Sequence, residues 1–276
     1  LTSITLPESL TSIEDYAFYN CYKLYEVYNK SDLTITAGST DNGRVACYAK
    51  NVYTDSEGES KLKTVGDYIF YVDGEEIELI AYTGSETSIT LPSDYEGKNY
   101  NIGDYAFYNC DSLTSITLPD GLTSIGDYAF EGCYRLYEVY NKSDLTITAG
   151  SSDNGYVACY AKNVFTDSEG ESKLKTEGDY IFYVDDEDIE FIAYTGNETS
   201  ITLPSDYEGK SYNIGDNAFW DCSSLTSITL PDGLTSIGDY AFQICSSLTS
   251  ITLPDGLTSI GESAFTYCSS LTGITL

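Results

Sequence analysis

Tyrosine is the first candidate for chemistry in this chain, because it recurs at every third position between residues 16 and 28. The positions are Tyr16, Tyr19, Tyr22, Tyr25 and Tyr28. A β-strand repeats its faces every two residues and an α-helix about every 3.6, so a period of three fits neither. The ring offers a large apolar surface and a hydroxyl group, and tyrosine is enriched in binding surfaces. The spacing therefore indicates rings arranged around a bend of the chain, either for packing or for binding.

Cysteine and acidic side chains could also do chemistry. Six of the eight cysteines are in register with a short repeat, and these are Cys21, Cys110, Cys133, Cys222, Cys245 and Cys268. Cys-x-x-Cys does not occur, so we expect no zinc site, and we expect the thiols to be reduced and buried as small apolar groups. The segment TDSEGES at 54–60 faintly resembles a calcium loop, but it lacks the required acidic spacing and is expected to be a solvated loop.

The absence of histidine excludes the catalytic mechanisms that depend on it. The chain has no histidine, which removes Ser-His-Asp and Cys-His catalysis and the usual imidazole metal ligand. Among its 44 acidic residues, no pair is marked out by the sequence as an acid and base. We therefore expect a protein that is not an enzyme and that has no cofactor.

The net charge of −31 restricts the possible partners. Such a surface repels nucleic acid and anionic lipid, and no apolar run is long enough to span a membrane. We expect a monomer that binds neither nucleic acid nor membranes.

The chain has no methionine and begins and ends within the repeat, at LTSITL and LTGITL. We therefore expect a piece of a longer extracellular or cell-surface protein, with its signal peptide and anchor outside this segment.

The elements that must position these residues are repeats of 23 residues with the pattern LTSITLPDGLTSIGDYAF. A longer repeat is superimposed on them, since residues 1–112 recur as 113–224 and a third, partial copy occupies 225–276. Within one short repeat, apolar residues form three separate edges joined by turns. Such a unit buries these edges only by stacking on its neighbours, so the pattern predicts a solenoid.

The short repeat also predicts particular strands and core residues. We expect strands at 3–5, 115–117, 227–229 and 250–252 in one parallel sheet, and Phe130 and Phe242 fully buried and stacked. The segments 24–109 and 136–221 depart from the plain repeat. They predict strands at LYEVY and LTIT (residues 24–28 and 33–36), followed by β-hairpins around Asp73-Gly74 and Asp185-Asp186.

The sequence CSSLTSITLPDGLTSIGDYAF at 222–242 and its echoes resemble the BspA-type leucine-rich repeat family of bacterial surface proteins. The resemblance implies one leucine-rich-repeat solenoid over 1–276, β-rich and of the α/β leucine-rich-repeat class. It would be a right-handed coil with one parallel sheet, short irregular or helical turns opposite, and two inserted hairpins. Family members look like adhesins that bind matrix or serum proteins. An adhesin-like binding module for host or neighbouring-cell proteins or glycans is the function this implies.

Four tyrosines are the candidate ligand-binding residues. Tyr25 and Tyr28 replace the small Thr114 and Thr117 of a plain repeat, and Tyr137 and Tyr140 are their counterparts in the second long copy. One hypothesis is that the rings form a binding surface, and the alternative is that they pack beneath the neighbouring hairpin. Two other functions remain open: a structural spacer, and a binder of ice or crystal surfaces through the regular Ser-x-Thr rows.

Overall fold

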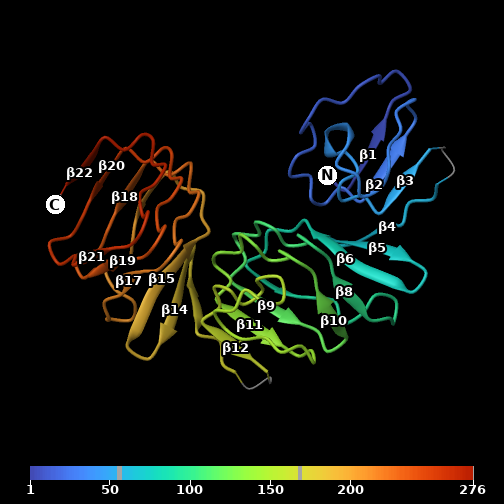
Figure 1. The fold of residues 1–276 in the computed structure, drawn as a ribbon. Helices are drawn as coiled ribbons and strands as arrows, with labels where there is room; N and C mark the ends of the chain where they lie inside the picture. Colours follow the sequence, from blue (N-terminus) through green and yellow to red (C-terminus); the bar gives the residue numbers. More distant parts are fainter. Residues whose placement is uncertain (55–57, 167–169, 276) are drawn as a thin grey trace. The chain divides into compact units, whose positions relative to one another are not determined.

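The computed structural model describes residues 1–54, 58–166 and 170–275, and the chain is a β-solenoid of about 12 turns. Within these ranges strands and turns alternate, and one short 3₁₀ helix occurs at Asn42–Arg44 (Figure 1). The predicted solenoid fold is therefore confirmed. The calcium-like loop considered at 54–60 includes residues 55–57, which lie outside the described residues.

The chain forms two compact units. Unit 1 comprises Leu1–Cys110, Ser115–Cys133 and Val139–Thr166. Unit 2 comprises Asp111–Thr114, Tyr134–Glu138 and Asp167–Leu276. The extent of a single solenoid domain over 1–276 stays a prediction. The long repeat is visible as repeated local structure, because the two inserted hairpins pair their strands in the same register at equivalent positions of the two copies.

The strands of the SIT motif and its variants form a first row, divided among three sheets. The first sheet holds β1 (Ser3–Leu6), β2 (Glu26–Asn29) and β3 (Asn51–Tyr53), paired in parallel. The second holds β7 (Ser88–Thr90), β9 (Ser115–Leu118), β11 (Glu138–Asn141) and β12 (Asn163–Phe165). The third, also parallel, holds β16 (Ser200–Thr202), β18 (Ser227–Thr229), β20 (Ser250–Thr252) and β22 (Gly273–Thr275).

The four strands predicted for this row are present, but the prediction that they share one parallel sheet is wrong. After β3 and again after β12 the chain leaves the coil to build a hairpin, and β7 and β16 then begin new ladders. The strand predicted at 33–36 is also wrong, and these residues are irregular. The Asn29 side chain donates from Nδ2 to the Leu33 backbone carbonyl at 2.7 Å, and its Oδ1 accepts the Ser31 hydroxyl at 2.6 Å, which bends the chain.

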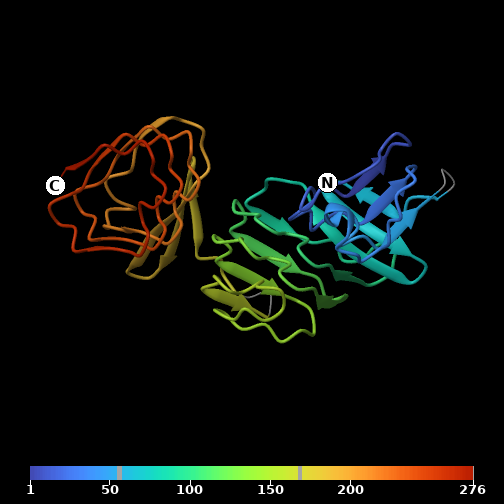
Figure 2. The same ribbon diagram turned by 45° about the horizontal axis from the view of Figure 1, so that its top comes forward.

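A second row of strands extends from each inserted hairpin (Figure 1). In unit 1 its order is β10 (Leu122–Ile125), β8 (Tyr100–Ile102), β6 (Glu76–Tyr82), β5 (Tyr68–Asp73) and β4 (Leu62–Val65). In unit 2 it is β13 (Leu174–Glu177), β14 (Tyr180–Asp185), β15 (Asp188–Tyr194), β17 (Asn213–Ile214), β19 (Ser236–Ile237) and β21 (Ser259–Ile260). The antiparallel pairs β5–β6 and β14–β15 confirm both predicted hairpins. Figure 2 shows the turns of unit 2 lying one behind another.

Stacked phenylalanines form the centre of each unit. Phe107 and Phe130 lie 4.7 Å apart between ring centroids in unit 1, and Phe219, Phe242 and Phe265 form a longer stack in unit 2. Phe130 and Phe242 are both 0% exposed, which confirms the prediction for them. Because identical positions of successive turns come into register, each ring packs on the same ring of the next turn.

The corner after the Gly-Asp of each repeat accounts for the outward tyrosines. The Asp104 carboxylate accepts the backbone N–H of Asp127, the same position of the next turn, at 2.8 Å. The residue that follows each aspartate has a positive φ, 56° at Tyr105 and 55° at Tyr128. This left-handed conformation reverses the chain direction sharply. The two following residues, Ala and Phe, then return to the core and leave the tyrosine ring outside it.

Candidate functional site

Two of the four predicted tyrosines are buried. Tyr25 is 4% exposed and lies 6.3 Å, between ring centroids, from Tyr71 of the hairpin strand β5. Tyr137 is 3% exposed, lies 6.2 Å from Tyr183 of β14, and donates its hydroxyl to the Asp216 carbonyl at 3.1 Å. Burial raises the pKa of both hydroxyls well above the usual value. These rings pack beneath the hairpins, as the packing alternative expects.

The other two predicted tyrosines, Tyr28 and Tyr140, are half-buried. Tyr28 stacks on Tyr53 of the neighbouring strand with 4.9 Å between ring centroids, and Tyr140 stacks on Phe165 at the same distance. Both pairs lie on strand faces beside the start of a hairpin segment. The four predicted residues therefore do not form one surface, because only Tyr28 and Tyr140 reach solvent.

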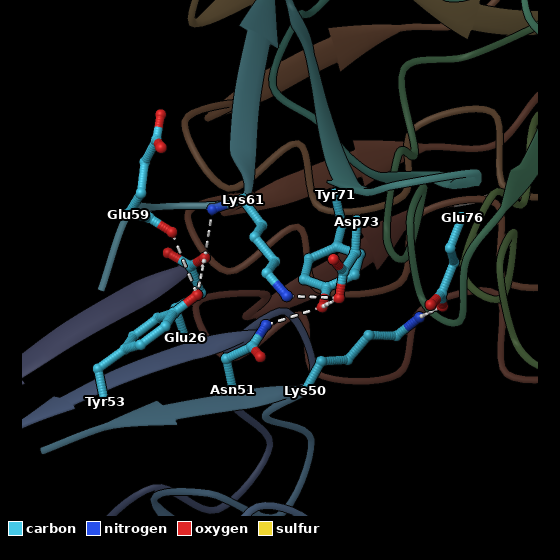
Figure 3. Close-up of polar contacts among 9 residues, drawn as sticks. All are labelled: Glu26, Lys50, Asn51, Tyr53, Glu59, Lys61, Tyr71, Asp73 and Glu76. Carbon is cyan, nitrogen blue, oxygen red and sulfur yellow. Dashed lines mark hydrogen bonds and ion pairs between the residues drawn. The ribbon is translucent and has the colours of Figure 1, made fainter. Parts of the chain in front are cut away.

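A buried carboxylate fixes the beginning of each hairpin segment, and sequence reasoning missed it. Glu26 is 0% exposed, and it accepts hydrogen bonds from the Lys61 backbone N–H at 2.7 Å and the Ser60 hydroxyl at 2.8 Å. The hydroxyls of Tyr28 and Tyr53 donate to the same carboxylate at 2.9 and 3.3 Å. Figure 3 shows part of this network. These four hydrogen bonds occupy both carboxylate oxygens of Glu26. The carboxylate therefore acts as a clamp that fixes the start of the hairpin segment, and we do not assign it the role of a base.

The second copy repeats this clamp. Glu138 is 0% exposed and accepts the Lys173 N–H at 2.7 Å and the Ser172 hydroxyl at 2.8 Å. Two sequence segments carry the residues of this clamp: YEVYN contains the glutamate and ESKLK contains the serine and lysine. Both segments recur unchanged in the second long copy, and this recurrence is the signal from which the clamp could have been predicted.

A lysine and its neighbouring asparagine attach the first hairpin to the solenoid near Glu26. Lys50 pairs with Glu76 at 2.7 Å (Figure 3). It also pairs with Glu78, and its ammonium lies 5.0 Å from the ring centroid of Tyr71. Asn51 donates to the Tyr71 hydroxyl at 2.8 Å. Aromatic, acidic and basic groups are thus already matched with each other here, so this cluster holds the fold together instead of offering open contacts.

A partly exposed stack of tyrosines lies on the corner of unit 1, and we call it the corner stack. Its central rings follow one another at centroid distances of 4.1 Å (Tyr22 to Tyr105), 5.4 Å (Tyr105 to Tyr128) and 5.6 Å (Tyr128 to Tyr156), with interplanar angles of 11°, 13° and 19°. Tyr48 and Tyr108 contact it edge-on. Tyr128 is 40% exposed, and the other members are half-buried. For Tyr105 and Tyr128 the sequence signal is a tyrosine that precedes Ala-Phe in successive repeats, whereas Tyr22 and Tyr156 lie at other positions of the repeat.

Sulfur and carboxylate groups form no metal centre in the part of the chain that the structure describes. All eight cysteines lie within the described ranges as thiols. Of the six cysteines in register with the short repeat, Cys133 and Cys245 are buried as predicted, while the other four are only partly buried. The Cys133 thiol donates to the Phe107 carbonyl of the preceding turn at 3.2 Å, and burial raises its pKa. These thiols act as packing groups.

Among the described residues no helix has the length and apolar character needed to cross a membrane.

Comparison with known proteins places the sequence in a family. A sequence profile of the BspA type leucine rich repeat region, in six copies, matches residues 1–79, 75–183 and 187–276. No curated protein matches the chain. Similar solved structures include a leucine rich repeat protein of T. pallidum, with 22% identity, 76% of this chain and 90% of that chain covered, and a TM-score of 0.28.

Two further solved structures have comparable similarity. A leucine-rich repeat protein from Bacteroides ovatus has 23% identity, with 80% of this chain and 53% of that chain covered and a TM-score of 0.28. A leucine rich cell surface protein from Faecalibacterium prausnitzii has 17% identity, with 80% and 96% covered and a TM-score of 0.29. The repeat profile covers nearly the whole chain. The chain therefore belongs to the BspA-type leucine-rich repeat family.

Proposed function

We propose that this chain is the binding module of a secreted or cell-surface protein and that it contacts proteins or glycans of a host or a neighbouring cell. Membership of a repeat family whose members act as interaction modules supports the general class. The adhesin-like role and the extracellular location go beyond that class. They rest on the resemblance to surface adhesins and on the surface that the tyrosines present.

The observation that carries the proposal is the corner stack. Large aromatic rings on a protein surface offer contact area at a low entropic cost, since tyrosine has few rotatable bonds. Stacking on neighbouring turns holds the rings in place before any partner arrives, which lowers the ordering cost of association. Tyr28 and Tyr140, the half-buried members of the predicted set, are proposed to add contacts at separate strand faces.

The test is a binding screen of the purified chain against immobilised extracellular-matrix proteins, serum proteins and glycans by surface plasmon resonance. We expect at least one ligand whose affinity falls by about 30-fold with Tyr128→Ala, since an anchor ring contributes about 2 kcal/mol. The double variant Tyr28→Ala/Tyr140→Ala tests the strand faces in the same way. Tyr267→Ala, which removes a tyrosine that is 72% exposed in unit 2, is the matched control. Unchanged binding by a folded Tyr128→Ala variant would refute this assignment.

A spacer is the second candidate, and the third sheet favours it. Its strands β16, β18, β20 and β22 present rows of serine and threonine in register, such as Thr202, Thr229 and Thr252, all exposed. Such rows are uniform and chemically quiet. A spacer has no ligand to lose, so a screen in which no macromolecule binds the folded chain would favour this candidate.

A further inference from the structure

The first long copy contains an arginine that is already bound by corner tyrosines. The guanidinium carbon of Arg44 lies 5.4 Å from the ring centroid of Tyr16 and 5.4 Å from that of Tyr19. The two rings meet edge-to-face with 5.8 Å between their centroids, and they are 64% and 57% exposed. A guanidinium placed against aromatic rings is held by attraction to the ring quadrupole. The fold therefore provides its own example of arginine recognition at this corner.

The second copy keeps the backbone of this site and changes two side chains. Arg44 becomes Tyr156, Tyr19 becomes Glu131, and Tyr16 is retained as Tyr128. The φ angles of Arg44 and Tyr156 are 67° and 69°. The backbone hydrogen bond from residue 19 to residue 16 measures 3.0 Å, and its counterpart from residue 131 to residue 128 measures 3.1 Å. The exchange thus removes the internal cation and adds a carboxylate without altering the geometry of the corner.

We propose that the corner formed by Tyr128, Glu131 and Tyr156 binds an arginine side chain of the partner on the outer side of Tyr156, the ring that takes the place of Arg44 against the retained tyrosine. This inference rests on the proposed function and names the chemistry of its partner. Tyr156 is the last ring of the corner stack, so a guanidinium placed on it extends the series of stacked planar groups. Glu131 supplies the carboxylate that pairs with the guanidinium.

Charge favours a cationic partner at this corner. Exposed Asp104 and Asp127 precede the stacked tyrosines of two successive turns, and the whole chain carries a net charge of −31. Burial raises the pKa of Tyr22 and Tyr105, and the negative charge of Glu131 adds to both increases. Arginine fits better than lysine, because the guanidinium is planar, stacks on rings and pairs with a carboxylate through two hydrogen bonds.

The experiment uses the full chain and three synthetic peptides that differ only at one set of positions, filled with arginine, lysine or citrulline. Citrulline keeps the shape of arginine and removes its charge. Isothermal titration calorimetry should give the tightest binding for the arginine peptide, with citrulline weaker by a factor between about 2 and about 30, the range expected for cation–π pairs. Equal binding of the arginine and citrulline peptides would overturn the proposal.

Variants then locate the site. Tyr156→Ala and Glu131→Gln should each weaken the arginine peptide several-fold, while Tyr156→Phe, which keeps the ring, and Tyr267→Ala should not. Tyr156→Arg restores the internal cation of the first copy and should also weaken binding. Circular dichroism confirms that each variant is folded. Wild-type affinity in both Tyr156→Ala and Glu131→Gln would exclude this corner.

The proposed function and this inference fail in different ways. If a macromolecule binds the chain and loses affinity with Tyr128→Ala, but the arginine peptide does not bind, then the proposed function stands and the arginine site is wrong. If the peptide binds at this corner and the screen finds no macromolecule, the arginine site is supported and the adhesin role is not.

Discussion

Replacing Phe242 by alanine should be among the most destabilising single changes in unit 2. The ring is 0% exposed and lies between Phe219, at 4.9 Å between centroids, and Phe265, at 5.3 Å, with all three planes nearly parallel. A buried Phe→Ala change costs about 3–5 kcal/mol. Each stacked pair adds about 0.5–1.5 kcal/mol, and two pairs are lost. The neighbouring turns are held by ladder hydrogen bonds and close the cavity poorly, so we expect a loss of about 5 kcal/mol.

Phe265→Ala is the matched comparison, because Phe265 is only half-buried and its stacking partner is Phe242. Its truncation removes one stacked pair and leaves a cavity open to water, so we expect about 2–3 kcal/mol. Trp220, the single tryptophan of the chain, donates to the Gln243 side chain at 2.9 Å beside Phe242. Its fluorescence therefore reports on the affected turns during urea unfolding.

The two variants should shift the urea midpoint by different amounts. With a slope of about 2 kcal/mol per molar urea, the midpoint should fall by about 2.5 M for Phe242→Ala and by about 1 M for Phe265→Ala. The stability of a repeat array is a sum of contributions from single turns and from the interfaces between them. The predicted change in urea midpoint therefore applies to the unfolding transition that Trp220 fluorescence follows. Midpoints within about 0.5 M of each other would contradict the reasoning from stacking and burial.

The remaining predictions concern the buried polar groups and the thiols. Glu26→Gln replaces an acceptor of four hydrogen bonds by an amide and should lower the unfolding free energy by about 2–3 kcal/mol, seen as an earlier urea transition. Tyr137→Ala should destabilise by about 3–5 kcal/mol and Tyr140→Ala by clearly less, and similar melting temperatures would contradict their different burial. Burial raises the pKa of Tyr68 and Tyr105 to about 12, whereas unfolded tyrosine titrates near about 10. The stability they contribute is therefore present below about pH 10 and lost as the pH rises towards about 12, and circular dichroism at increasing pH should show unfolding in this window. A thiol reagent should react slowly with the native chain. In denaturant it should react with all eight cysteines, and a smaller number of reactive groups there would indicate disulfides.

Local regularities of the sequence were enough to predict the strands of the short repeat and two of its core residues, but not the structure at 33–36. The constant period of the short repeat places identical residues in register, so the burial of Phe130 and Phe242 follows from repetition alone. The hairpins were predictable from alternation on both sides of Asp73-Gly74. The division into separate sheets was not, because it depends on where the chain re-enters the coil after each hairpin. No local pattern at Ser88 or Ser200 specifies that a new ladder begins there.

The roles of the tyrosines show the same division between sequence and structure. The repeat pattern was sufficient to predict that they lie outside the core edges of the repeat and that they recur with it. Which of them are covered depends on contacts in the folded chain: Tyr25 and Tyr137 are buried by a hairpin that begins much later in the sequence, and Tyr128 is not. Burial is a property of contacts between distant segments, whereas strand and turn preferences act over neighbouring residues. For the same reason Glu26, a surface residue by type, becomes a buried clamp once Ser60 and Lys61 fold over it.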